Sequence, residues 1–209
     1  MTIIEQIKTR LDELRSLDRD ITIFGAKFGH EYKLRPRLTE DEAVAFEREH
    51  AIELPKDYRA YLTEMGNGGA GPSYGVFPLG IWDGPGTNEP WDSRFVGKLS
   101  DPFPHRQKWN PAKIRTKGDE EPTEEEEAAE FDPAMMAGAF PICHHGCALR
   151  SWLVVSGPER GNVWYDARAD DRGVWPEVDA DCKRLTFSDW YLKWIEDSLA
   201  KVWKAKRTR

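Results

Sequence analysis

The sequence is poor in cysteine and has no long apolar run. Its three cysteines are an odd number and show no disulfide framework, which argues against a small disulfide-stabilised secreted domain. No apolar run approaches the ~20 residues that a membrane-spanning helix needs. The first twenty residues carry charges of both signs throughout and do not resemble a signal peptide. From these absences we expect a cytoplasmic protein with no membrane partner.

Negative charge exceeds positive charge in the chain as a whole, but not at its end. The net charge is −7, but the last nine of the 209 residues hold five cations and no acid, so residues 1–200 together carry −12. A body of this charge repels nucleic acid and attracts basic partners. Acidic surfaces also serve simply to keep proteins in solution. We therefore expect no nucleic-acid partner, and both interpretations of the acidity stay open.

Four helices are predicted where a capping residue precedes apolar positions at helical spacing. The predicted helices begin at Thr2, Thr39, Pro55 and Thr186, with Pro55 as the first helical residue of the third. The third helix must end at Asn67, Gly68 and Gly69, because these residues readily take the left-handed conformation that closes a helix. We interpret Asn67, Gly68 and Gly69 as a structural turn in which Gly68 or Gly69 has a positive φ.

Short strands are predicted where β-branched and aromatic residues lie between turn residues. They are expected at Ile21–Phe24, Glu31–Leu34, Val76–Leu79, Leu149–Val155, Asn162–Asp166 and Val174–Val178. No internal repeat and no clean linker interrupts the chain. We therefore expect one domain over residues 1–209.

Residues 81–132 lose this periodicity and are rich in Pro, Gly, Trp and charge. Nine acids and no base lie between Asp119 and Asp132. An irregular stretch of this length inside a domain is usually functional or disordered. Within it, Thr123 is suited to cap a short solvated helix over Glu124–Glu130.

This acidic insert supplies the candidate partner-binding residues. Its acids are suited to speed the encounter with a basic protein and to set specificity, or they form only a solvated face. Its tryptophans anchor a partner if they are exposed, or else they belong to the core. The candidates are Trp82, Asp83, Trp91, Glu124, Glu125, Glu126 and Glu127.

Three sequence segments, in this order, resemble the SUKH superfamily. The first is LTEDEAVAFEREHAIELPKDYRAYLTEMGNGGAGPSYGVFPLG (residues 38–80), the second is PICHHGCALRSWLVVSGPERGNVWYD (141–166), and the third is TFSDW (186–190). The first is similar to the family's capped helix, glycine turn and entry into the sheet, and the second to its strand-turn-strand. The resemblance covers about residues 38–200. The N-terminal helical extension, residues 1–35, and the acidic insert lie outside the family pattern.

The resemblance implies an α+β fold with helices packed on a curved, mostly antiparallel sheet, and it implies no catalytic residue and no cofactor. Many bacterial members look like immunity proteins that neutralise a partner toxin, commonly a nuclease, whereas eukaryotic relatives are regulatory scaffolds. We therefore expect a protein-binding function and no enzyme activity. The first hypothesis is an immunity-type protein that sequesters a basic toxin domain. The alternative is a cytoplasmic regulatory protein with another protein ligand.

A cluster of cysteine and histidine, CHHGC from Cys143 to Cys147, is the third and weakest candidate, as a metal site of a hydrolase. Structural zinc sites usually space their ligands as two separated pairs, which this cluster does not do. We therefore expect no metal, with the cysteines packed as small apolar residues and the histidines facing water. The chain contains no Gly-x-Ser-x-Gly, phosphate-loop or dinucleotide motif.

Overall fold

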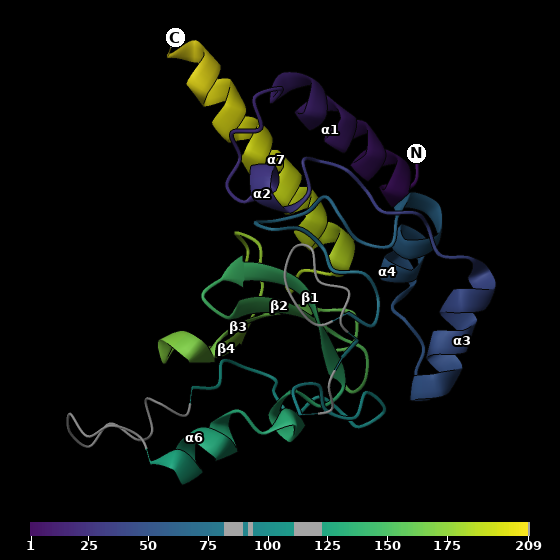
Figure 1. Ribbon diagram of the computed structural model, residues 1–209, viewed down its shortest axis with the longest axis vertical. Helices are drawn as coiled ribbons and strands as arrows, with labels where there is room; N and C mark the ends of the chain where they lie inside the picture. Colours follow the sequence, from purple (N-terminus) through teal and green to yellow (C-terminus); the bar gives the residue numbers. More distant parts are fainter. Residues whose placement is uncertain (82–89, 92–93, 111–122, 209) are drawn as a thin grey trace.

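The computed structural model describes residues 1–81, 90–91, 94–110 and 123–208, and Figure 1 colours its elements along the chain. The helices are α1 (Ile3–Leu17), α2 (Ala26–Gly29), α3 (Glu40–His50), α4 (Lys56–Ala60), α6 (Glu124–Glu130) and α7 (Phe187–Arg207). Shorter helical turns are η1 (Tyr61–Met65), η2 (Pro133–Met136) and η3 (Arg168–Asp170). The strands are β1 (Ala139–Gly146), β2 (Leu149–Val154), β3 (Val163–Ala167) and β4 (Gly173–Pro176).

The four strands form one antiparallel sheet in the order β1-β2-β3-β4. The register of β1 against β2 shifts twice, between Pro141 and Cys143 and between His144 and Gly146. Shifts of this kind bend a strand and re-aim its side chains. Helices combined with an antiparallel sheet make the fold α+β, which confirms the predicted fold class.

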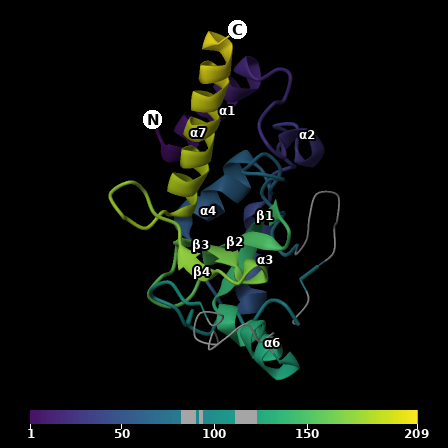
Figure 2. The same ribbon diagram turned by 90° about the vertical axis from the view of Figure 1, so that its left-hand side faces the viewer.

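The helices α1 and α7 lie on one side of the sheet (Figures 1 and 2). They run in the same direction, because Arg10 of α1 pairs with Glu196 of α7 while Leu17 lies near Val202. Each helix turns an apolar stripe inward. The buried apolar residues are Ile4, Ile7, Leu11 and Leu14 in α1, and Phe187, Trp190, Tyr191, Ile195, Leu199 and Val202 in α7.

The other face of the sheet is covered by residues 94–110 and by the segment that carries α6 and η2, which lies below the sheet in Figure 1. The ring of Trp164 in β3 packs against Phe103 with centroids 4.9 Å apart. Because neighbouring residues of a strand point to opposite faces, Val163 points toward the helices and Trp164 toward this second layer. Val163, Trp164 and Phe103 are all buried.

Capping residues begin the helices at the predicted positions. Reciprocal capping boxes open α1 at Thr2, α3 at Thr39, α6 at Thr123 and α7 at Thr186. Each box satisfies backbone N–H groups that the first helical turn leaves without a partner. One prediction is wrong by a residue: Pro55 is the N-cap of α4 and not its first helical residue.

Three of the predicted strands are wrong. Neither Ile21–Phe24 nor Glu31–Leu34 forms a strand, because Ile21, Glu31 and Tyr32 have φ of +51°, +48° and +58°. Positive φ is incompatible with extended backbone. Val76–Leu79 forms no strand either and is held by isolated bridges from Val76 to Gly69 and Cys143.

Candidate functional site

The turn at Asn67, Gly68 and Gly69 joins segments that are distant in sequence. Gly68 and Gly69 have φ of +88° and +102°, where glycine escapes the steric penalty of a Cβ. A Cβ on Gly69 would overlap the carbonyl group of Lys33. The Asn67 side chain accepts a hydrogen bond from the backbone N–H of Leu79 at 2.8 Å. These contacts give the turn a structural role.

The four candidate glutamates, Glu124 to Glu127, form the first turn of α6 and are all exposed. Glu126 is also a capping residue, because its carboxylate accepts hydrogen bonds from Thr123. The other three carboxylates face solvent. Acidic side chains in a first helical turn interact favourably with the helix dipole. The sequence of α6 thus suits both the helix and a negatively charged surface.

A buried arginine holds the end of α6 against the sheet. Arg168 donates hydrogen bonds to both carboxylate oxygens of Asp166, at 3.0 and 2.7 Å, and to the carbonyl oxygen of Glu130 at 2.8 Å. Its guanidinium also lies 5.2 Å from the ring centre of Phe131. Because Arg168 and Asp166 are both buried, this bidentate pair is shielded from water and fixes the position of α6.

The aromatic candidates of the acidic insert differ in placement. Trp82 and Asp83 lie outside the described residues. Trp91 is half-buried, its indole N–H donates to the carbonyl oxygen of Ile81 at 2.8 Å, and its ring lies 5.0 Å from that of Phe140. Trp91 therefore packs against the core, and part of its ring stays accessible.

The Cys-His cluster is part of strand β1. Cys143 is buried, and its thiol donates to the carbonyl oxygen of Pro72 at 3.2 Å. Burial raises the pKa of the Cys143 thiol well above its usual range, so it stays protonated. Cys147 is exposed. Within the described ranges, no group of three His, Cys, Asp or Glu side chains is placed to hold a metal ion.

The expectation that the histidines face water is wrong. His145 is half-buried, with Nδ1 2.9 Å from the hydroxyl of Ser73 and Nε2 2.8 Å from the hydroxyl of Ser151. Burial, aided by the neighbouring His144, lowers the pKa of His145 to about 4, so the ring is neutral at pH 7. The register shift at His144–Gly146 accounts for this placement, because a bulge re-aims the side chains of its strand.

His145 lines a cleft of about 240 Å³ between the sheet and α7, here called the α7 cleft. Its walls come from five parts of the chain. The lining residues are Ile23, Phe24, Pro72, Ser73, His145, Glu177, Trp190, Lys193, Trp194, Asp197, Ser198 and Lys201. Outside the cleft, the ring of Tyr165 lies 5.1 Å from that of His145, and the ring of Trp175 lies 5.0 Å from that of Tyr165.

The only acid that the sheet side contributes to this cleft, among the residues the structure describes, is Glu177, directly after β4. Its backbone is tied to β3 by a hydrogen bond of 2.8 Å from its N–H to the carbonyl oxygen of Val163. Its half-buried carboxylate accepts no hydrogen bond within the described part of the chain. Burial raises the pKa of Glu177, and the positive charge of Lys193 opposes that shift only in part.

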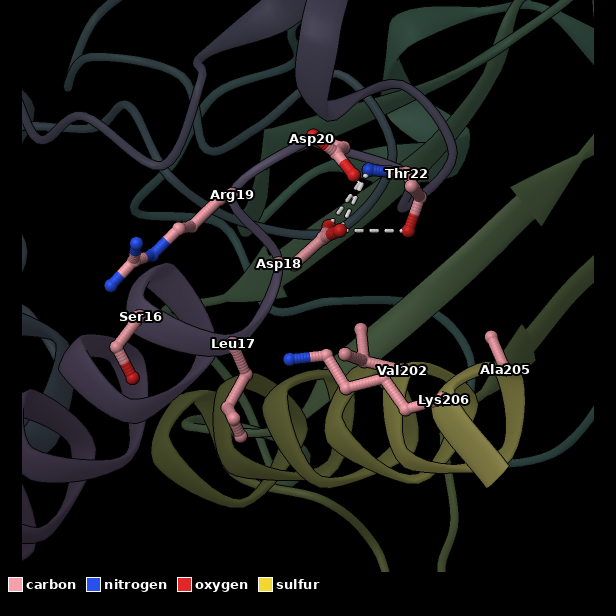
Figure 3. A pocket seen from close by; sticks show the side chains of 9 residues that line it. All are labelled: Ser16, Leu17, Asp18, Arg19, Asp20, Thr22, Val202, Ala205 and Lys206. Carbon is pink, nitrogen blue, oxygen red and sulfur yellow. Dashed lines mark hydrogen bonds between the residues drawn. The ribbon is translucent and has the colours of Figure 1, made fainter. Parts of the chain in front are cut away.

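A second pocket, of about 460 Å³, lies where α1 and α7 end (Figure 3). The carboxylate of Asp18 in this pocket already has hydrogen-bond partners within the protein. It accepts hydrogen bonds from the N–H and hydroxyl of Thr22 and from the hydroxyl of Tyr32. Lys206 extends across the pocket from α7. Since the carboxyl ends of helices carry partial negative charge, Lys206 in the last turn of α7 is favourably placed. The α7 cleft, by contrast, contains a carboxylate that accepts no hydrogen bond from any residue that the structure describes.

Sequence patterns did not identify Glu177 or Ser73 as site residues. Glu177 was included in a predicted strand, Val174–Val178, and nothing local marks it as different from any other charged residue at a strand end. The sequence around Glu177 does not indicate which residues α7 brings near it.

One family model, described as the SMI1 / KNR4 family (SUKH-1), matches residues 37–191. The matched range begins just before α3, contains the glycine turn, α6 and the whole sheet, and ends within α7. Neither the curated proteins nor the solved structures contain a match to this chain. In the described residues, no helix is both long and apolar enough to cross a membrane.

Proposed function

Because the chain belongs to the SMI1/KNR4 family (SUKH-1), we propose that it is an immunity-type protein of the cytoplasm that binds and neutralises a basic toxin domain. Membership in this family supports an immunity or regulatory role exercised on a protein partner. A basic toxin domain, such as that of a nuclease, is the partner that best fits the acidity of the body of the chain.

The observation that carries this proposal is the exposed acidic turn of α6 on a rigid support. Glu124, Glu125 and Glu127 project from a helix that the buried Arg168–Asp166 pair anchors to the sheet. Charges on a fixed element keep a defined pattern, whereas charges on a mobile tail do not. A defined negative pattern attracts a positive partner over about a Debye length and orients it during the encounter.

The chemistry of the cleft supports binding in preference to catalysis. The thiol of Cys143 is buried and protonated, so it is not an activated nucleophile. Both ring nitrogens of His145 are engaged by serine hydroxyls, and its lowered pKa leaves it a weak base. A general base requires a pKa near the working pH. We therefore propose no enzyme activity for this chain.

The proposal is tested with two variants that remove equal charge from different places. The first carries Glu124→Gln, Glu125→Gln and Glu127→Gln, and it leaves Glu126 in place because that residue caps α6. The matched control carries Asp41→Asn, Glu49→Gln and Glu64→Gln, three exposed acids of other helices. The partner is captured from the host with the native protein, identified, purified and then measured by surface plasmon resonance over a range of salt concentrations.

We expect the α6 variant to associate about tenfold more slowly at low salt, with a shallower salt dependence, and the control to change the rate by less than about twofold. Co-expression with the toxin adds the functional measurement, in which native protein restores growth. A captured partner that is acidic, or that has no toxic activity, refutes the immunity role. Equal slowing by both variants refutes α6 as the contact surface.

A further inference from the structure

Among the described residues that line the α7 cleft, Glu177 is a carboxylate whose charge is only partly compensated. The carboxylate of Glu177 is half-buried, and no described residue donates a hydrogen bond to it or forms an ion pair with it. A charge removed from water costs free energy unless a partner of opposite charge compensates for it. The cleft therefore favours an occupant that brings a positive charge to Glu177.

Among the described residues, the cations that line the cleft form no ion pair with Glu177. The ammonium of Lys193, which acts on Glu177 through its charge, forms an ion pair at 2.6 Å with Asp197, another lining residue of the cleft. Lys201 lines the rim and is exposed. His145 is neutral at pH 7 and is held by Ser73 and Ser151. The position next to Glu177 is thus open to a cation from outside.

The walls of the cleft suit the rest of a long basic side chain. Trp190 and Trp194 of α7, together with Phe24 and Pro72, line the same cleft as Glu177 and contribute apolar surface to it. Methylene groups of lysine and arginine pack well on such surface while the charged end reaches a polar group, and aromatic faces attract cations. The volume of about 240 Å³ is smaller than the ~300–1,000 Å³ usual for cofactor and small-molecule pockets, so it suits a single side chain.

We propose that the α7 cleft receives one lysine or arginine side chain of the protein partner, with the charged end on the Glu177 carboxylate and the methylenes against Trp190 and Trp194. This inference rests on the proposed function, whose partner is basic. It adds a specific anchor to the long-range attraction of α6, and the two surfaces act at different stages. Charge on α6 governs association, while a desolvated anchor governs dissociation.

The anchor is tested without the partner by NMR titration of the full-length protein with four small probes. They are the N-acetyl methylamides of lysine, arginine, norleucine and glutamate. Norleucine has the same carbon chain length as lysine without the ammonium group. The readouts are the indole N–H signals of Trp190 and Trp194 and the carboxyl ¹³C shift of Glu177. The variant is Glu177→Gln, and the control is Glu64→Gln, which removes the same charge at an exposed position.

We expect the lysine and arginine probes to shift both indole signals and to lower the pKa of Glu177, because a bound cation favours the ionised carboxylate. The norleucine and glutamate probes bind at least about fivefold more weakly, and Glu177→Gln removes that difference while Glu64→Gln keeps it. Equal binding of norleucine and lysine overturns the proposal, and so does lysine binding that survives Glu177→Gln. An unchanged spectrum at the highest concentration of every probe overturns it as well.

The purified partner separates this inference from the proposed function. If the inference holds, Glu177→Gln speeds dissociation about tenfold and leaves the association rate nearly unchanged. If Glu177→Gln has no effect on the partner while the α6 variant slows association, the inference fails and the proposed function stands. If the partner is not a basic toxin but the lysine probe binds, the cleft is a basic-side-chain pocket that serves a different role.

Discussion

The two faces of the sheet are covered by different kinds of structure. On one face, Phe140 of β1 packs against Tyr58 of α4 at 5.6 Å, and Tyr58 packs against Phe187 of α7 at 4.7 Å, all of them buried aromatic contacts with helices. On the other face, irregular chain packs the buried ring of Phe103 against Trp164, and Arg168 ties the end of α6 to Asp166 of the sheet. Both layers bury apolar area, and the second adds a shielded ion pair.

This difference has a consequence for binding. The exposed side chains in the first turn of α6 can change without repacking of the core, and α6 lies on the second layer. The α7 cleft lies on the other side, where the helices pack on the sheet. The two proposed contact surfaces therefore differ in burial: the glutamates of α6 are exposed, whereas Glu177 is half-buried in the α7 cleft. Substitutions can distinguish their effects.

The largest effect is expected in the helical layer. Phe187→Ala removes a fully buried ring that contacts Tyr58, Tyr61 and Tyr191, and it should lower the free energy of unfolding by about 3–5 kcal/mol. Phe131→Ala is the control, because Phe131 is 48% exposed and lies in the other layer. Its cost should stay below about 1 kcal/mol. Urea denaturation measures both free energies. Similar costs for the two variants would mean that the buried ring of Phe187 contributes no more to stability than the half-exposed ring of Phe131.

The next effect concerns the buried Arg168–Asp166 ion pair of the second layer. Arg168→Met leaves Asp166 buried without its partner and should cost about 3 kcal/mol, measured by urea denaturation. In the double variant Arg168→Met, Asp166→Leu, no unpaired charge remains, so we expect it to be more stable than the single variant. A double variant that is less stable than the single one would show that the ion pair does more than satisfy its own charges.

The glycine turn is expected to contribute less. Gly69→Ala places a Cβ at a φ of +102°, where it overlaps the carbonyl group of Lys33, and it should cost about 2 kcal/mol. The control is Gly80→Ala. Gly80 also has a positive φ, but a Cβ added there would have no heavy atom closer than 4.0 Å. The difference between the two unfolding free energies isolates the overlap from the backbone strain. Equal values would contradict a role of Gly69 in holding the segments together.

The smallest expected effect is on the pH dependence of stability. In the folded protein the pKa of His145 is about 4, against 6.5 for an exposed histidine. Between pH 6.5 and pH 4 the unfolded chain binds a proton at this site that the folded chain does not, so stability falls as the pH is lowered through that window.

His145→Asn keeps a side chain able to hydrogen-bond with the serines and removes the titration, so it should reduce the loss of stability between pH 6.5 and pH 4 by about 1–2 kcal/mol. Part of the loss remains, because burial also lowers the pKa of His30 to about 4. Urea denaturation at pH 7, 5.5 and 4.5 measures the slope. An unchanged slope would mean that His145 gains its proton without disturbing the fold.

Several parts of the fold were predictable because their causes are local. A threonine followed three residues later by an acid satisfies the N–H groups of its own first turn, so Thr2, Thr39 and Thr186 mark helix starts in the sequence. Strand β2 was predicted for a similar reason, from β-branched and aromatic residues between turns. Local composition did not predict a separate strand at Ala139–Gly146, since Pro141, His144 and His145 are not typical strand residues.

The wrong predictions share a cause. Ile21–Phe24 has strand composition, but the buried carboxylate of Asp18 binds the backbone N–H groups of Thr22 and Ile23, at 2.8 and 3.2 Å. The Asp18 carboxylate thus binds N–H groups that a strand would pair with a neighbouring strand. Asp18 is held in this position by the hydroxyl of Tyr32, which is fourteen residues away in the chain. The same holds for His145, whose serine partners come from two other segments.

The sequence by itself determined the family, the helix starts, the glycine turn and the acidity of α6, because each depends on residues that are close together in the chain. Only the tertiary structure decided that Glu177 lines one cleft with Trp190 and Trp194, and that Arg168 anchors α6. Burial and the pKa of a carboxylate depend on which distant segments exclude water from it. A charged residue next to a strand looks the same in the sequence whether α7 covers it or leaves it in solvent.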